Sequence, residues 1–352
     1  MSQKKPRLLV FWQGASGYLA ACLRALADDG CQIHLVLQNN RDDVQFELQD
    51  FTHPLIQLYS LEKLSKSKLK NLHDDIKPDL LMVSSWHIRK YIYVAHRSNA
   101  IRVLCMDNQW RGTLKQRLGV LGRSLLIKRN FDIALVPGDR QRKFANLLGF
   151  LDEKIWIGLY SADTQKFLNE NSERELEFIF VGRLVQEKGI NNLIAAYNLY
   201  REKVSTPLKL RVCGIGPYEA AFQGTSGVIL NGFVQPTDLP RILAKSSIML
   251  VPSEFEPWGV VIHEGCASGL FVICTFECGA AFPLVEDGWN GRIIPSQNPL
   301  KLMQAMLEAH QIMEKDSELI SSRSRSIANR YTPDMWAANI IRRFNDELEF
   351  RT

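Results

Sequence analysis

The 352-residue sequence lacks the features that mark disulfide-stabilised and membrane-spanning proteins. Its seven cysteines are an odd number scattered along a long chain, and Cys274 and Cys278 have no second metal-like pair nearby. The basic amino terminus carries only a short apolar run before its glycines, without the length of a secretion signal or of an 18-residue membrane span. We therefore expect a cytoplasmic protein with reduced thiols.

Charge and composition exclude two further classes. A net charge of +5 does not by itself require nucleic acid, and the basic clusters lack the interleaved aromatic residues of nucleic-acid modules. The contents of 46% hydrophobic and 23% charged residues are those of a globular protein, so a disordered chain is not expected. We predict no nucleic-acid partner.

Two series of short apolar runs alternate with helix-like segments. The first covers residues 7–12, 31–38, 79–85, 101–107, 131–137 and 154–160, and the second covers 177–182, 208–214, 227–232, 247–253, 270–275 and 291–295. Nearly continuous apolar strands separated by helices predict parallel sheets covered on both faces. The fold class is therefore α/β, with two Rossmann-like, doubly wound domains facing each other across a cleft at their strand ends.

The polar stretch 162–174 has no strand signal and suits a connection between domains. We place an N-terminal domain at 1–165 and a C-terminal domain at 166–331. Helix-like runs follow the second series at 298–314 and 317–330. A terminal helix over 332–352 could pack back on the first domain.

The segment SEFEPWGVVIHEG, residues 253–265, places two carboxylates around an apolar helix start. The residue before a proline avoids the α region, and proline suits the first helical position. Glu256 should therefore lie just before a helix that Pro257 opens, and Glu264 inside it. Both carboxylates could then face one ligand; alternatively, Glu256 caps the helix and Glu264 is solvated.

Other polar or glycine-rich turns follow predicted strands. Arg183 and Lys188 could clamp a diphosphate at a strand end, or they could be solvated surface charges. Gly214 and Gly216 permit close approach of a ligand to the backbone, but they also suit a tight turn. The turn at 13–17 precedes a helix start whose amides could receive an anion, although it lacks the GK[ST] ending of a P-loop.

Four segments between residues 182 and 295 follow one another in the order GRLVQEKG, CGIGP, PSEFEPWGVVIHEGCASGLFVI and DGWNGRIIP. This series resembles the carboxyl-terminal half of retaining glycosyltransferases of family 4, which have the GT-B fold. The first half of the chain agrees in layout, with looser motifs. The resemblance implies transfer of a sugar from a nucleotide-diphosphate donor to a saccharide, glycolipid or other hydroxyl acceptor. Surface polysaccharide or glycoconjugate biosynthesis would be the setting.

The resemblance also implies roles for individual residues. Glu256 would hold hydroxyls of the donor sugar, Glu264 would bind the nucleotide ribose, and Arg183 and Lys188 would neutralise the diphosphate. Amides at the helix start would also face the donor, those of Trp258, Gly259 and Val260. The remaining predicted donor-binding residues are Gly14, Gly17, Gly182, Gly214 and Gly216.

In this family the leaving phosphate is thought to accept the proton of the acceptor during front-face attack. We therefore assign no separate base, no metal and no cofactor beyond the nucleotide sugar, UDP- or GDP-linked. The sequence departs from the family at Asp107, where a histidine is usual. A carboxylate could accept a hydrogen bond from a sugar hydroxyl, but its charge and reach differ. His87, Trp110 and Arg111 are candidates on the acceptor side, although a lone histidine is as readily structural.

A leucine stripe and a run of cations mark the segment 109–129. The stripe consists of Leu114, Leu118, Leu121 and Leu125, and the cations are Arg111, Lys115, Arg117, Arg123, Lys128 and Arg129, with no acid among them. This segment could lie peripherally on an anionic membrane at the cytoplasmic face, or its leucines could face the core. Another basic cluster comprises Lys63, Lys66, Lys68 and Lys70.

Two other functions share the predicted architecture, because fold alone does not fix the reaction. One is a nucleotide-sugar epimerase or phosphorylase. The other is a catalytically silent sugar-nucleotide-binding protein, which the departure at Asp107 suggests. Transfer of a labelled sugar to an added acceptor separates both from a transferase.

Overall fold

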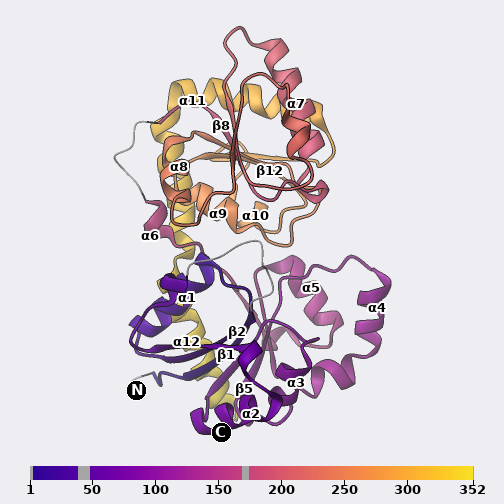
Figure 1. The fold of residues 1–352 in the computed structure, drawn as a ribbon, viewed down its shortest axis with the longest axis vertical. Coiled ribbons are helices and arrows are strands. Elements are labelled where there is room, and N and C mark those ends of the chain that lie inside the picture. The colour runs from indigo at the N-terminus through magenta and orange to yellow at the C-terminus, as the bar shows by residue number, and fades with distance from the viewer. Residues whose placement is uncertain (1–2, 39–47, 169–173, 352) are drawn as a thin grey trace. The chain divides into compact units, whose positions relative to one another are not determined.

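A computed structural model describes residues 3–38, 48–168 and 174–351. The chain forms two compact units. Unit 1 combines Met1–Ser161 with Pro333–Thr352, and unit 2 is Ala162–Thr332. Each unit is built on one parallel sheet with helices on its faces (Figure 1), so the predicted doubly wound α/β fold is confirmed.

Unit 1 contains a seven-stranded sheet in the order β3-β2-β1-β4-β5-β6-β7. Its strands are β1 (Arg7–Gln13), β2 (Gln32–Gln38), β3 (Ile56–Ser60), β4 (Leu80–Val83), β5 (Ile101–Cys105), β6 (Ile133–Val136) and β7 (Ile155–Ile157). The helices are α1 (Gly17–Asp28), α2 (Lys66–Ile76), α3 (Arg89–Ala95), α4 (Leu114–Leu121), α5 (Asp139–Leu147) and α12 (Pro333–Arg351).

The central strand β1 shows why the strands of unit 1 are apolar at nearly every position of their sequence. Leu8 and Val10 pack into the core beneath α1 and α12, whereas Leu9 and Phe11 pack into the opposite core with α2, α3 and α5. Because successive side chains of a strand point to opposite faces, a sheet covered on both sides needs apolar residues at every position.

The edge strand β3 was not predicted. It pairs with β2, and Gln57 and Leu58 are exposed in its centre. A strand that is buried at only some positions does not produce a continuous apolar run, so periodicity alone does not separate it from a loop.

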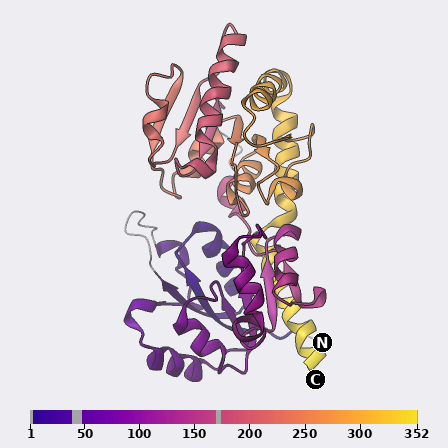
Figure 2. The ribbon, with the colours of Figure 1, turned by 90° about the vertical axis from the view of Figure 1, so that its right-hand side faces the viewer.

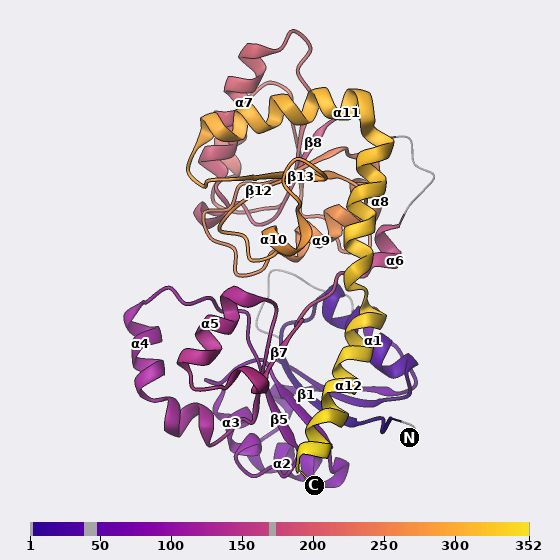
Figure 3. The ribbon, with the colours of Figure 1, turned by 180° about the vertical axis from the view of Figure 1, so that it is seen from behind.

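Helix α12 packs along unit 1 beside α1 (Figure 3). Its buried side chains recur at the spacing of a helical stripe, at Trp336, Ala337, Ile340, Ile341 and Phe344. The amino-terminal segment is bonded to α12: the Lys4 backbone N–H donates to Asn345 Oδ1 at 3.0 Å, and the Asn345 amide donates to Lys4 O at 3.1 Å. The two marked chain ends accordingly lie close together in Figure 2. Lys154 Nζ lies 2.7 Å from the buried carboxylate of Glu347.

Unit 2 contains a six-stranded sheet in the order β10-β9-β8-β11-β12-β13. The strands are β8 (Phe178–Val181), β9 (Leu210–Cys213), β10 (Val228–Gly232), β11 (Ile248–Val251), β12 (Phe271–Thr275) and β13 (Gly291–Ile294). Its helices are α6 (Thr164–Phe167), α7 (Ile190–Lys203), α8 (Leu239–Lys245), α9 (Val260–Ala267), α10 (Ala281–Leu284) and α11 (Pro299–Ala328). Helix α11 is kinked at Asp316, between the two runs that the sequence predicted separately.

All seven cysteines are buried, and none of them forms a disulfide bond. Among the residues that the structure describes, no helix is both long and apolar enough to cross a bilayer.

Candidate functional site

The strand order places a switch point in the middle of each sheet. In unit 2 the chain runs outward from β8 through β9 to β10, and then returns to start the other half at β11. Ligands of open α/β sheets bind outside the carboxyl ends of the two strands at such a point. The pairing of β8 with β11 ends at Ile179 and Met249, so the last two residues of each strand leave the shared ladder. The loops at 182–189 and 252–259 follow these two ends.

Lys188 and Glu256 bring the two switch-point loops of unit 2 together. The Lys188 ammonium contacts the Glu256 carboxylate directly, and the side chains are 20% and 12% exposed. The carbonyl of Glu187 accepts hydrogen bonds from the amides of Glu254 at 2.9 Å and Phe255 at 3.2 Å. Since the backbone holds the two loops together, the ion pair has a defined place at the strand ends.

Helix α9 begins three residues later than the sequence predicted. It starts at Val260, so the expectation that Pro257 occupies the first helical position is wrong. The carbonyl of Glu256 instead accepts a hydrogen bond from the Gly279 amide at 3.1 Å, and that of Trp258 accepts one from the Ala280 amide at 2.8 Å. These bonds hold the stretch against the neighbouring loop in a non-helical conformation. Glu256 still precedes the helix, and Glu264 still lies inside it.

Gly259 sets the start of α9. Its φ of 91° is in the left-handed region, and a Cβ there would lie 2.9 Å from Glu256 Cγ, so only glycine fits. The N-cap residue of α9 is therefore Gly259, which has no side chain to cap the helix. The first amides of a helix have no intrahelical partner and carry positive partial charge, so the start of α9 can receive an anion.

Glu264 lies one turn into α9, on the same face as Val260. Among the described residues no hydrogen bond or ion pair engages its carboxylate. Burial raises the pKa of Glu264 from 4.5 to about 7. A half-buried carboxyl group without a protein partner is suited to accept hydrogen bonds from the hydroxyls of a ligand.

Arg183 is the exposed member of the predicted site. Its side chain points into solvent, and within the described ranges nothing bonds its guanidinium. The next residue is fixed, because Leu184 N–H donates to Ile215 O at 2.9 Å. The backbone therefore holds Arg183 at the end of β8 while its guanidinium remains available.

The predicted donor-binding glycines of unit 2 also have a packing role. A Cβ on Gly214 would lie 1.8 Å from the carbonyl oxygen of Gly182, and one on Gly216 would lie 2.5 Å from that of Leu184. The turns after β8 and β9 thus touch backbone to backbone. This contact excludes any side chain at these two positions, whether or not a ligand is bound.

His263 was missed in the sequence, although it stands beside Glu264. Its Nδ1 accepts the Ala162 N–H at 3.1 Å, and its Nε2 lies 3.1 Å from Ala328 O. Burial lowers the pKa of His263 to about 4, so the neutral ring accepts at one nitrogen and donates at the other. Both bonds join segments remote in sequence, which a local motif does not reveal.

Unit 1 has its own switch point between β1 and β4. Gly14, with a φ of 74°, turns the chain after β1 and donates its N–H to Gln38 O at 3.0 Å. Gly17 is the first residue of α1, and a Cβ added there would meet no neighbouring atom. Ser16 caps this helix, because its Oγ accepts a hydrogen bond from the Leu19 N–H at 3.3 Å. The turn approaches β4 because Gln13 N–H donates to Ser84 Oγ at 3.0 Å.

Asp107 follows β5 and contacts an aromatic pair. Tyr160 donates its hydroxyl to Asp107 Oδ2 at 3.3 Å, and the ring of Tyr18 packs edge-on against Tyr160 at 4.9 Å. Burial and the neighbouring Asp107 charge raise the pKa of Tyr160, so it remains a donor. The usual histidine position is thus occupied by a hydrogen-bonded carboxylate.

The three predicted acceptor-side residues are in different settings. His87 is exposed and its ring bonds Ser85 Oγ at 2.9 Å. Trp110 packs on Phe144, with ring centroids 5.6 Å apart, at the edge of a core cluster. Arg111 is exposed, and its backbone N–H donates to Gln116 Oε1 at 2.7 Å.

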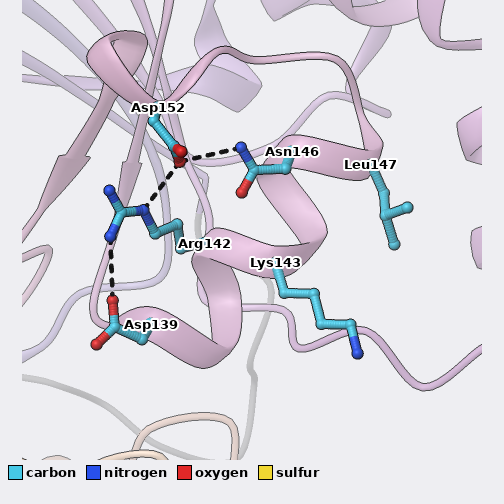
Figure 4. A pocket seen from close by; sticks show the side chains of 6 residues that line it. All are labelled: Asp139, Arg142, Lys143, Asn146, Leu147 and Asp152. Atoms are coloured by element: carbon cyan, nitrogen blue, oxygen red, sulfur yellow. Dashed lines mark hydrogen bonds and ion pairs between the residues drawn. The ribbon is translucent and has the colours of Figure 1, made fainter.

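A shallow hollow on unit 1 lies over α5 and the turn that follows it (Figure 4). Arg142 lies between Asp152, at 3.0 Å, and Asp139, at 3.5 Å, and Asn146 also bonds Asp152. Lys143 points away from this network. Since the other polar groups of the hollow satisfy one another, it does not resemble a catalytic site.

No group of three or more His, Cys, Asp or Glu side chains in the described part of the chain could hold a metal ion. Arg183, Lys188 and the start of α9 place positive charge at the switch point of unit 2.

Comparisons with known proteins agree with this geometry. The family model for glycosyl transferases group 1 matches residues 175–311, and the glycosyl transferase 4-like model matches residues 7–116. An uncharacterized glycosyltransferase of Methanocaldococcus jannaschii is 23% identical over 62% of this chain and 59% of its own. The matched part of the chain spans 33% to 59% of the first three curated relatives.

Solved structures share the whole fold. Anabaena HepE, crystallised with UDP-glucose, has a TM-score of 0.74 at 17% identity and covers 96% of this chain and 99% of its own. A glycosyltransferase from Rickettsia africae has a TM-score of 0.76 at 14% identity, over 97% and 98% of the two chains. With two doubly wound units and family matches in both, this chain belongs to the group 1, family-4-like glycosyltransferases of the GT-B fold.

Proposed function

We propose that this protein transfers a sugar, with retention of anomeric configuration, from a UDP-sugar to a hydroxyl group of a saccharide or lipid-linked acceptor. The observation that carries the proposal is the contact of Lys188 with Glu256 beside the start of α9. A cation, a carboxylate and the first amides of a helix meet there at a switch point, which is the combination that a sugar diphosphate requires.

In this proposal the diphosphate accepts hydrogen bonds from Arg183, Lys188 and the amides at the start of α9. Lys188 then shares its charge between the diphosphate and Glu256, which keeps the carboxylate oriented toward hydroxyls of the donor sugar. Glu264 accepts bonds from the ribose. The UDP-glucose complex of HepE supports UDP as the carrier, because its fold matches this chain.

In this proposal, catalysis rests on electrostatic stabilisation of the leaving group. As the bond between the sugar and the diphosphate breaks, negative charge develops on the leaving oxygen, and donors fixed at the switch point stabilise it without reorganisation. The leaving phosphate accepts the proton of the acceptor hydroxyl, so neither a separate base nor a metal ion is required. Removing one fixed donor of this kind typically lowers the rate by ~10² to 10³.

We assign the acceptor to unit 1, near Asp107, His87 and Arg111. Surface polysaccharide or glycolipid assembly on the cytoplasmic side of a membrane would supply such an acceptor. Asp107 would contribute an oxygen acceptor there, held by the hydroxyl of Tyr160.

The test uses donor binding and transfer as separate readouts. Thermal unfolding with UDP-glucose, GDP-glucose or no ligand identifies the donor, because a ligand bound only by the folded state raises the Tm. Transfer of labelled glucose to a pool of membrane glycolipids is then measured for the wild type and Arg183→Ala. Lys301→Ala, an exposed cation elsewhere in unit 2, is the matched control.

We expect a UDP-glucose shift in all three proteins and a large loss of transfer in Arg183→Ala alone. A shift without transfer to any acceptor would favour a silent binding protein. Absence of any nucleotide-dependent shift would refute the site.

A further inference from the structure

The leucines of α4 face away from the protein. Leu114, Leu118 and Leu121 are 79%, 66% and 81% exposed, and no residue of α4 is buried. Their spacing puts them on one side of the helix. The expectation that they face the core is therefore wrong, whereas the side chain of Leu125 lies outside the described part of the chain. We call Leu114, Leu118 and Leu121 the leucine stripe.

Two further exposed leucines lie outside α4. Leu126 and Leu151 are 51% and 63% exposed. The turn after α5 contacts the segment that follows α4, because Arg123 Nη1 bonds Leu147 O at 3.4 Å and Lys128 Cε lies 2.7 Å from the Cβ position of Gly149. Figures 1 and 3 show α4 at the margin of unit 1, beyond α5.

Cations lie before, within and after the leucine stripe along the chain. Six side chains, all exposed, form what we call the basic collar: Arg111, Lys115, Arg117, Arg123, Lys128 and Arg129. Residues 108–131 themselves contain no acidic side chain. Asp132, the next acid, is already engaged by Arg102 at 2.7 Å and Arg351 at 3.2 Å. Near the turn after α5, Asp152 is bonded by Arg142 and Asn146.

An exposed apolar stripe with a cationic rim matches the surface of an anionic bilayer. The hydrocarbon boundary accepts leucine side chains, while lipid phosphates accept hydrogen bonds from Lys and Arg. A nucleic acid would use the basic collar but leave the leucines in water. The stripe itself carries no hydrogen-bonding group that would specify a particular polar partner.

We propose that α4 docks unit 1 on an anionic lipid bilayer, with the leucine stripe at the acyl boundary and the basic collar on lipid phosphates. This interaction is independent of the donor site in unit 2. It would hold the enzyme at the surface where a lipid-linked acceptor is presented.

The experiment measures co-sedimentation of the full-length protein with vesicles. Phosphatidylcholine vesicles are compared with vesicles that also contain phosphatidylglycerol, at low and high salt. We expect binding only to the anionic vesicles, with weaker binding at high salt, because salt screens exposed charges. Absence of binding to anionic vesicles overturns the proposal and leaves a protein partner as the occupant of the stripe.

Two variants separate insertion from simple charge attraction. The triple replacement Leu114→Gln, Leu118→Gln and Leu121→Gln keeps every charge, and we expect it to weaken binding at least about tenfold. The matched control replaces Lys63, Lys66 and Lys68 of the other basic cluster by Gln and should bind like the wild type. Wild-type binding by the leucine variant, or an equal loss in the control, would overturn the proposal.

Folding and insertion are checked in the same proteins. Because the leucine stripe makes no buried contact, the Tm of the triple variant and its UDP-glucose shift should equal those of the wild type. All native cysteines are buried, so Leu118→Cys can be labelled selectively with an environment-sensitive dye. Its emission should shift to the blue on anionic vesicles, whereas a dye at Leu300→Cys in unit 2 should not change.

Discussion

Replacing Glu264 by Gln should have opposite effects on stability and on donor binding. Burial raises the pKa of Glu264 to about 7, so the folded protein binds this proton more tightly than the unfolded chain does. The contribution of Glu264 to stability is therefore fully present below pH 4.5 and is lost as the pH rises toward 7. At pH 8 the wild type carries an ionised, half-buried carboxylate without a protein partner.

The magnitude follows from the shift. A change from 4.5 to about 7 would correspond to about 3 kcal/mol if the group were fully buried. Because Glu264 is only half-buried, solvent screening reduces this to roughly 1–2 kcal/mol. The Glu264→Gln variant keeps the volume without the charge, so we expect its Tm at pH 8 to be several degrees above that of the wild type. The two proteins should converge near pH 4.5.

Donor binding should change in the other direction. Losing a charge-assisted contact to the ribose hydroxyls costs about 1.5–3 kcal/mol, or roughly 10- to 150-fold in the Kd of UDP-glucose. In the wild type this affinity should rise from pH 6 to pH 8 as Glu264 ionises, and the Glu264→Gln variant should lose that rise.

Calorimetric unfolding at pH 5 and pH 8, with and without UDP-glucose, measures both effects. Glu318→Gln, which removes an exposed carboxylate of unit 2, is the control for net charge. A Glu264→Gln variant that is less stable than the wild type at pH 8, or that binds UDP-glucose as tightly, would refute this account of Glu264.

Three further perturbations test other contacts. Lys188→Ala should lower turnover by ~10² or more and also destabilise unit 2, because it leaves Glu256 without its cation, whereas Arg183→Ala should lower turnover at unchanged Tm. Gly214→Ala should lower the free energy of unfolding by at least about 2 kcal/mol through its clash with a backbone carbonyl, while Gly119→Ala, with open space around it, should be neutral or stabilising in denaturant titrations. His263→Ala should destabilise unit 2 by about 2 kcal/mol or more, since it removes both buried hydrogen bonds of the ring. Chemical denaturation with intrinsic fluorescence measures this loss, and an unchanged midpoint would contradict the bonding of His263.

The local sequence pattern predicted twelve of the strands that the structure describes, and the motifs indicated the family. Runs such as 79–85 and 247–253 are apolar at nearly every position because both faces of their sheets are covered, and that requirement is visible in any short window. The edge strand at 56–60 was not predicted, because only some of its side chains are buried and its sequence is not a continuous apolar run. Glu256 before a helix and Glu264 inside it could also be predicted, since proline restricts its neighbour locally.

Only the tertiary structure decided how these residues act together. The start of α9 moved past Pro257 because carbonyls of that stretch bond a loop some twenty residues away, and Gly214 is required by a backbone segment after another strand. The exposure of the leucine stripe was likewise undetermined, because an amphipathic pattern fixes which residues share a side but not what that side contacts. Backbone geometry and periodicity are local and can be read from sequence, whereas burial, ion pairing and the pKa of Glu264 depend on atoms that only folding brings near.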